Sequence, residues 1–320
     1  MFPRRVRWTE GRFANVDGIP FQMSVRTRTS PALFAAFTID PDRAAEMLPG
    51  EELHPCRILT RGLLVLAVVN YLDTPIGTYV EFCIGILVTR GLRPAPPLLS
   101  LAAAPLFGTG VYIYDLPVST EVSVKGGLGI WGMPKRRANL DFVIGDDRVS
   151  SQYDLDGQLV ARVDVPRPRR TSLPMWLNGV GYGDFRGMLN KSLIYMRGTM
   201  GLSLFAADAR LLLGDHPRAD PLKRLDIDPR PLVTGFAPRF DGVLDDHVET
   251  WFLISESPPG EPQSGIDDVA GLGLSREWPP PPDRATSDRL MAELTPDQRV
   301  GRQTRPPMLR PERQTAKASS

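Results

Sequence analysis

The chain has few of the residues that disulfide and metal sites require. Its 320 residues include only two cysteines, Cys56 and Cys83, and three histidines, His54, His216 and His247. Two cysteines cannot form a disulfide framework or a four-cysteine zinc site, and three scattered histidines argue against a histidine metal cluster. We therefore expect a protein of a reducing compartment with no metal site. No glycine-rich loop of the dinucleotide or phosphate type appears either, and we expect no bound cofactor.

Excess charge and long apolar runs are also missing. The 38 basic and 37 acidic residues leave a net charge of +1, so no global charge attracts nucleic acid or an anionic membrane. The longest apolar run, Gly62 to Val69, is too short to cross a bilayer, and the basic N-terminus lacks the apolar stretch of a signal peptide. These features predict a cytoplasmic protein without nucleic-acid or membrane partners.

The composition divides the chain into three parts. Residues 1–30 are polar and basic and are expected to form an arm, whereas residues 31–256 carry the apolar segments of one domain. Residues 257–320 hold 11 of the 32 prolines and few apolar residues, so we expect a disordered tail there. Within it, Leu290, Met291 and Leu294 form a weak helical pattern that could dock on a partner.

Most of the domain carries the patterns of β-strands. Arg57–Leu72 and Tyr79–Val88 are aliphatic and β-branched around a Pro75–Gly77 turn, which predicts a hairpin of buried strands. Further strands are expected at Leu33–Ile39, Val111–Pro117, Glu121–Lys125, Asn139–Ile144, Val149–Leu155, Leu159–Val165, Met188–Phe205 and Ala209–Leu213. A short helix is expected after Asp40 and Pro41, as its N-cap and first residue. This ratio of strands to helices indicates a strand-rich α+β domain closed as a barrel or cone.

The segment Ile130 to Phe142 is the candidate reactive site, because Lys135 stands at its centre with Arg136 and Arg137 behind it. A lysine attacks a carbonyl only as the neutral amine, and a neighbouring cation or removal from water favours that form. The proline-rich, apolar stretch Gly91 to Gly110 is a candidate roof for a pocket. On pattern alone, however, a run of three cations is more often a solvated face.

Three segments resemble the acetoacetate decarboxylase family: Tyr79-Val-Glu81, the run from Gly127 to Arg136 that contains Met-Pro-Lys-Arg, and Ala209 to Leu222. The resemblance covers roughly residues 20–250 and implies a closed antiparallel β-barrel or cone with few short helices. It places the Schiff-base role on Lys135 and an active-site acid on Glu81. It also implies a homo-oligomer and, near the N-terminal edge of the pocket, a carboxylate-binding arginine, here Arg28.

One residue departs from the family. Its decarboxylases carry a second lysine beside the first, and the activating effect of that neighbour, known for acetoacetate decarboxylase itself, is taken over from the family. Here the position holds Arg136, a permanent cation that either repels the Lys135 ammonium or turns away to pair with a carboxylate. Trp131 and Met133 are candidate substrate-binding residues, although core packing explains them equally well.

The resemblance implies a lyase that decarboxylates a β-keto acid through an imine on Lys135, with no metal. Two alternatives remain open. The same imine can serve aldol condensation, dehydration or hydration of a keto acid, or the fold can be a binding module in which Lys135 is only a structural ion-pair partner. Glu81 has its own alternative, as an edge residue that faces water.

Overall fold

A computed structural model describes residue 6, residues 11–255 and residues 272–294 of the chain. Its strands are β1 (Arg12–Val16), β2 (Ile19–Met23), β3 (Val25–Ile39), β4 (Leu53–Pro55), β5 (Gly62–Tyr71), β6 (Tyr79–Arg90), β7 (Gly110–Val118), β8 (Lys135–Arg137), β9 (Asn139–Leu140), β10 (Val143–Ile144), β11 (Arg148–Leu155), β12 (Gln158–Pro166), β13 (Leu173–Phe185), β14 (Met188–Leu204), β15 (Arg210–Leu213) and β16 (Pro231–Phe252). Its helices are α1 (Pro41–Ala45), α2 (Leu99–Ala102), η2 (Ala104–Phe107), α3 (Glu121–Trp131), η3 (Pro217–Ala219), α4 (Asp220–Lys223) and α5 (Ala285–Glu293). None of these described helices is long and apolar enough to span a bilayer. The strand-rich α+β class is therefore confirmed.

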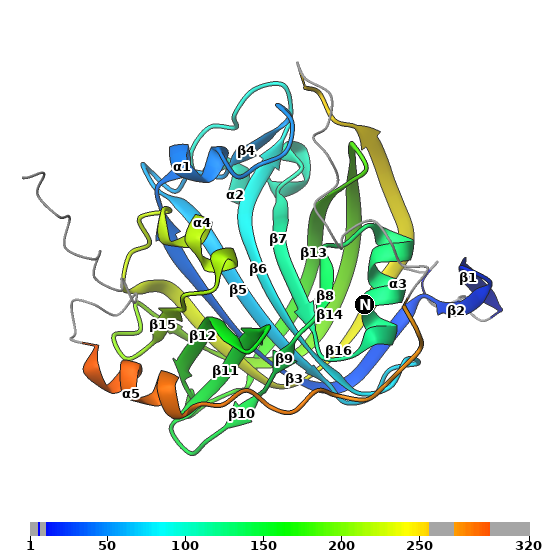
Figure 1. The fold of residues 1–320 in the computed structure, drawn as a ribbon. Helices are drawn as coiled ribbons and strands as arrows, with labels where there is room; N and C mark the ends of the chain where they lie inside the picture. The colour runs from blue at the N-terminus through cyan, green and yellow to red at the C-terminus, as the bar shows by residue number, and fades with distance from the viewer. Residues whose placement is uncertain (1–5, 7–10, 256–271, 295–320) are drawn as a thin grey trace, which may run out of the picture.

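A strongly curved sheet of nine strands dominates the fold (Figure 1). Its strand order is β4-β6-β5-β3-β16-β14-β13-β7-β8, and β7 also pairs with β6. We expected antiparallel pairing throughout, yet β7 runs parallel to β13 over two residue pairs and parallel to β8 over three. The sheet is therefore mixed: β7 is antiparallel to β6 and parallel to both β8 and β13.

The main hydrophobic core lies between this sheet and a smaller one, in which β10, β11, β12 and β15 are neighbours and β9 pairs with β11. Successive side chains of a strand point to opposite faces of its sheet, and β5 shows the consequence. Leu64, Leu66 and Val68 are fully buried in the core, whereas the alternate residues Val65 and Ala67 are only partly buried and face the other way.

Several local predictions are confirmed. Strands β5 and β6 form the expected antiparallel hairpin, in which Tyr71 pairs with Tyr79. Helix α1 begins after Asp40, whose carboxylate accepts hydrogen bonds from the backbone N–H groups of Asp42 (2.9 Å) and Arg43 (3.2 Å).

The segment that begins at Glu121 is an α-helix, α3, and our prediction of a strand there is wrong. Its alternating valines mimic a strand, and its glycines are poor helix formers. Tertiary packing overrides both signals, because the glycines lie where neighbouring side chains approach the helix closely. An added Cβ on Gly126 would stand 3.0 Å from Phe21, and one on Gly129 would stand 2.6 Å from Val16.

The predicted boundary at residue 30 does not coincide with a structural boundary, because β3 runs from Val25 to Ile39 and joins the large sheet throughout. The preceding strands, β1 and β2, form a two-stranded sheet of their own. Val16 and Phe21 from this hairpin pack against Val122 of α3. The described part of the predicted arm thus supports the helix that precedes Lys135.

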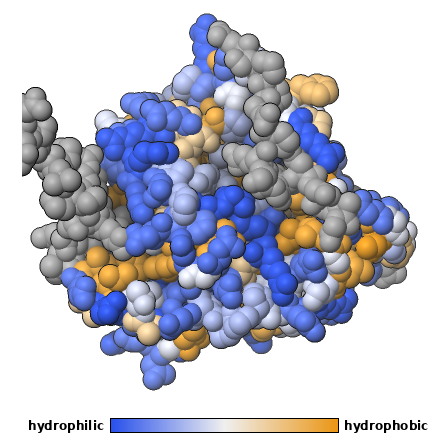
Figure 2. Space-filling model, viewed as in Figure 1, coloured by the Kyte–Doolittle hydropathy of each residue, from blue (hydrophilic) through white to orange (hydrophobic). Residues whose placement is uncertain are grey.

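Residues 272–294 are not a free tail, and for this stretch the prediction of disorder is wrong. Arg284 makes two hydrogen bonds to the Asp141 carboxylate, at 2.6 and 2.7 Å, and Met291 of α5 is buried. The indole of Trp278 donates to the Thr78 carbonyl at 3.1 Å. Hydrophobic residues gather near α5 on the face shown in Figure 2. The rest of this predicted tail, residues 257–271 and 295–320, lies outside the described residues.

Candidate active site

A cavity of about 260 Å³ lies against the face of the large sheet that points away from the main core. Its wall is mostly hydrocarbon, and Arg26, Glu81 and Lys135 are its charged residues among the described part of the chain. The aliphatic lining residues are Val25, Val65, Ala67, Val69, Val111, Ile113, Leu116, Met133, Leu177, Val180, Ile194, Met196, Val243 and Leu244. We call this space the Lys135 cavity.

Lys135 reaches the cavity because the chain turns sharply after α3. Gly132 ends the helix in the left-handed conformation, at φ 63°, where glycine has no steric penalty. Residues 133 and 134 then lead into β8, and Lys135 pairs with Leu116 of β7. The lysine side chain is only 6% exposed.

The Lys135 side chain lies along one face of α3. An added Cβ on Gly127 would stand 2.3 Å from Lys135 Cδ, so the lysine stem fills the space that a larger residue would occupy. Its Nζ donates to Ser123 Oγ at 3.2 Å. Ser123 and Gly127 are four residues apart and share a helix face, so Ser123 contacts the amine and Gly127 makes room for the stem.

Glu81 is the carboxylate partner of the amine. Its Oε2 lies 2.6 Å from Lys135 Nζ, and its Oε1 accepts a hydrogen bond from the Tyr71 hydroxyl at 3.2 Å. Tyr71 stacks on Tyr79, with ring centroids 4.5 Å apart. Burial, and then the charge of Glu81, raise the pKa of both phenols well above the usual value, so both remain neutral.

Cys83 follows Glu81 on the same face of β6 and also lines the cavity. Burial raises the pKa of its thiol to about 12, and the negative charges of Glu81 and Asp115 act in the same direction, while the charge of Lys135 opposes them. The thiol is therefore neutral near pH 7, and a neutral thiol is a weak nucleophile. Cys83 serves this site as part of its apolar wall.

Arg136 points away from the Lys135 cavity, because successive side chains of β8 alternate. Its Nε lies 2.8 Å from Asp115 Oδ1, and Asp115 is completely buried. The same carboxylate accepts a hydrogen bond from Tyr153 at 3.0 Å and lies 3.7 Å from Arg218 Nη1. Of the two possibilities that the sequence leaves for Arg136, the structure therefore shows pairing with a carboxylate.

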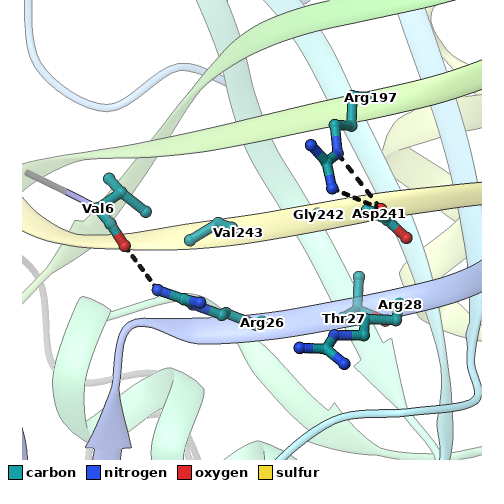
Figure 3. A pocket seen from close by; sticks show the side chains of 8 residues that line it. All are labelled: Val6, Arg26, Thr27, Arg28, Arg197, Asp241, Gly242 and Val243. Atoms are coloured by element: carbon teal, nitrogen blue, oxygen red, sulfur yellow. Dashed lines mark hydrogen bonds and ion pairs between the residues drawn. The ribbon is translucent and has the colours of Figure 1, made fainter. Parts of the chain in front are cut away.

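Of the two arginines on β3, Arg26 lines the Lys135 cavity and Arg28 does not. Arg26 donates to the Val6 carbonyl at 2.7 Å, and both arginines line a neighbouring pocket (Figure 3). A further surface pocket is lined by Arg26 and Arg28 together with Asp73 and Thr74. Arg26 and Thr74 line both this surface pocket and the Lys135 cavity, so the two spaces adjoin at these residues.

Of the other two predicted substrate-binding residues, one lines the cavity and one does not. Met133 lines the cavity, but Trp131 lies behind the wall, where its indole donates to the Asp245 carbonyl at 3.1 Å. The predicted roof, Gly91 to Gly110, contributes no residue to the lining; part of it forms α2 and η2.

Sequence reasoning missed Tyr71 and Ser123. The register of the predicted hairpin would have placed Tyr71 opposite Tyr79, but Ser123 was hidden by the incorrect strand prediction for α3.

Comparisons with known proteins give consistent results. The model of the family "Acetoacetate decarboxylase (ADC)" matches residues 14–237. A solved structure of acetoacetate decarboxylase has a TM-score of 0.51 at 15% identity and covers 72% of this chain and 90% of its own. The acetoacetate decarboxylase of Legionella pneumophila has a TM-score of 0.50 at 15% identity and covers 74% of this chain and 91% of its own. At these identities the two structures show a shared fold. A search of curated protein sequences finds no match.

Proposed function

Because the chain belongs to the acetoacetate decarboxylase family, we propose that it decarboxylates a β-keto acid through a Schiff base on Lys135. The observation that carries this proposal is the position of the Lys135 amine, 2.6 Å from Glu81 in a largely apolar cavity. Family membership supports an enzyme, and the arrangement of the amine and the carboxylate supports this particular chemistry.

The first step joins the amine to the substrate. The Lys135 ammonium passes a proton to an acceptor, and Glu81 is the carboxylate within hydrogen-bond distance. The neutral amine then attacks the ketone carbon, and the carbinolamine loses water to give an iminium ion. The apolar wall limits the water that would compete with these steps.

The iminium ion makes loss of carbon dioxide possible. As the bond to the carboxylate carbon breaks, its electron pair flows toward the iminium nitrogen and leaves a neutral enamine. Protonation of the enamine carbon restores an iminium ion, and water then releases the ketone and the free lysine. Glu81, held by Tyr71, is the proposed proton carrier of these later steps. The lysine itself supplies the electron sink, so the reaction as proposed needs no metal.

Arg26 is the proposed partner of the substrate carboxylate, since it is the arginine that lines the cavity. Arg28, which the sequence predicts for this role, lines the adjoining surface pocket and adds positive charge there. Positive charge beside the cavity favours the approach of an anionic substrate.

Reductive trapping tests the proposal. Incubation with acetoacetate and borohydride should add the reduced substrate to Lys135, as located by mass spectrometry of peptides. The adduct should be absent in Lys135→Ala and present in Lys223→Ala, which removes a surface lysine paired with Asp220. Absence of an adduct with every β-keto acid tried contradicts the proposal.

The same samples separate the two alternatives. Carbon dioxide release without an added aldehyde identifies a decarboxylase, whereas product that forms only with an aldehyde identifies an aldol reaction. A non-catalytic binding module predicts binding of keto acids without turnover, with Lys135→Ala weakening affinity or stability alone.

We also propose a cytoplasmic homo-oligomer, as the family resemblance implies. The exposed apolar side chain of Trp176 on β13 offers a contact for self-association. Light scattering of the purified protein would give the mass of the assembly, and a monomer at micromolar concentration would exclude it.

A further inference from the structure

The Lys135 cavity extends far beyond the reacting groups. Glu81 pairs with Val69 of β5, and Val65, four residues along the same strand, still lines the cavity. On β7 the lining continues to Val111, whose partner on β6 is Leu87, six residues from Glu81. At about 3.4 Å per residue, this lining follows the strands for roughly 20 Å.

The two ends of the cavity differ in chemistry. Arg26 and Thr74 line the part of the cavity that adjoins the surface pocket, and Glu81 holds the Lys135 amine. The far end is hydrocarbon: Val65 and Ile113 lie at one level, because both strands pair with Gly85.

Val111, two residues from Ile113 on β7, pairs with Gly181 of β13, and Gly181 pairs on its other side with Ser192 of β14. Beside Val111 and Gly181, Ser192 is the polar side chain among the described lining residues, and its hydroxyl donates to the Gly181 carbonyl at 3.4 Å. The far end therefore suits a hydrocarbon chain and not a second polar group.

The cavity is also larger than a small keto acid requires. Its volume of about 260 Å³ lies just below the ~300–1,000 Å³ of pockets that bury drug-sized ligands. Acetoacetate has a single methyl group beyond its ketone, and it would leave the Val65 and Val111 end of the cavity without a ligand atom. Apolar surface that a ligand covers contributes to binding in proportion to its area.

We infer that the Lys135 cavity takes β-keto acids that carry an extended apolar chain beyond the ketone. The carboxylate lies at the Arg26 end, the ketone carbon at the Lys135 amine, and the chain runs along β5 and β7 toward Val111. This inference rests on the proposed function and names the substrate class of the same site.

A series of substrates tests it. We would compare acetoacetate, 3-oxohexanoate and 3-oxooctanoate by carbon dioxide release with the full-length protein. Burial of each added methylene should raise kcat/KM by about fourfold, until the chain reaches the end of the cavity. A value of kcat/KM that stays level or falls from acetoacetate onward overturns the inference.

The far wall gives a second test through chain-length preference. Val111→Phe should move the preferred substrate to a shorter chain, because the ring occupies the apolar end. The matched control is Val143→Phe, at an exposed position of β10 outside the cavity, which should keep the wild-type preference. If the two variants share one chain-length profile, the proposed placement of the chain is wrong.

Two experimental outcomes distinguish a failure of this inference from a failure of the proposed function. If borohydride traps acetoacetate on Lys135 and longer acids react no faster, the imine chemistry stands and the chain-length inference fails. If no keto acid is trapped, the proposed function fails, and calorimetry with butanoate, hexanoate and octanoate then tests the cavity alone. A Kd that falls with chain length supports an apolar-chain site, and a constant Kd overturns it.

Discussion

Gly127 and Lys135 pack so closely that a methyl group on Gly127 would stand 2.3 Å from Lys135 Cδ. The helix that precedes the lysine therefore determines where the amine lies. In Gly127→Ala the lysine stem must move, and misplacement of a reacting group by about 1 Å can cost roughly a hundredfold in rate. We expect borohydride trapping to slow by about that factor.

Gly126→Ala is the matched control for this change. It adds the same methyl group to the same helix, but on a side where Phe21 lies 3.0 Å away. Both substitutions raise helix propensity by about 1 kcal/mol, so a helix effect alone would act on them equally. Equal trapping rates in the two variants would show that Gly127 does not position Lys135.

Glu81→Gln tests the proton carrier. The amide keeps the size of the side chain and an acceptor for Tyr71, but it cannot take up a proton from Lys135. Loss of general acid–base catalysis typically costs about 10²–10⁴-fold in rate, so kcat should fall at least a hundredfold. Glu249→Gln, which changes a carboxylate paired with Lys191, should leave kcat near the wild-type value. A Glu81→Gln enzyme with normal kcat would remove Glu81 from the mechanism.

Arg136→Met distinguishes a structural role from an electrostatic one. It leaves the buried Asp115 carboxylate with Tyr153 and the more distant Arg218. Breaking a buried ion pair costs about 3–5 kcal/mol, and we expect about 3 kcal/mol here because Arg218 remains. Urea unfolding measures this loss, and kcat of the folded variant should change little. A large loss of kcat at unchanged stability would instead support an electrostatic effect on Lys135.

Alkaline pH should destabilise the protein through the groups beside the amine. The pKa values of Cys83, Tyr71 and Tyr79 are raised in the folded state, chiefly by burial, above ordinary values of 9.0 for the thiol and 10.0 for the phenols. Below pH 9 the folded and the unfolded protein both hold these protons, and the three neutral groups contribute their full stabilisation to the folded state. Above pH 9 the unfolded chain loses these protons at a lower pH than the folded protein does, so the free energy of unfolding falls as pH rises.

Urea unfolding at pH 7.5, 9.0 and 10.5 checks this slope. Tyr71→Phe removes one of the ionisable groups and should reduce the decline between the two higher values. A free energy of unfolding that is constant up to pH 10.5 would contradict the prediction.

The sequence predicts well where local signals and packing agree. The hairpin of β5 and β6 follows from aliphatic runs around a turn, and α1 from its capping residue and proline. The sequence does not indicate the long strand β16 at residues 231–252, because the apolar residues there are interrupted by charged ones. That strand pairs with both β3 and β14, so its place depends on partners distant in sequence.

In the candidate site, too, some features follow from local sequence signals and others depend on distant partners. Lys135 and Glu81 were found through short motifs, and the structure brings them together. The direction of the Arg136 side chain and the difference between Arg26 and Arg28 depend on strand register, which no local pattern fixes. Residues 272–294 were misjudged by composition, because Arg284 and Met291 contact partners that lie far away in the sequence.

Strand β5 serves two purposes with alternate residues. Leu64, Leu66 and Val68 belong to the main core, and Val65, Ala67 and Val69 form a wall of the cavity. Substitutions in the second set can reshape the cavity while the first set keeps the two sheets together. Evolution can therefore change the ligand of this scaffold at every second position of the strand and leave its folding intact. A directed-evolution library would be built on those same positions.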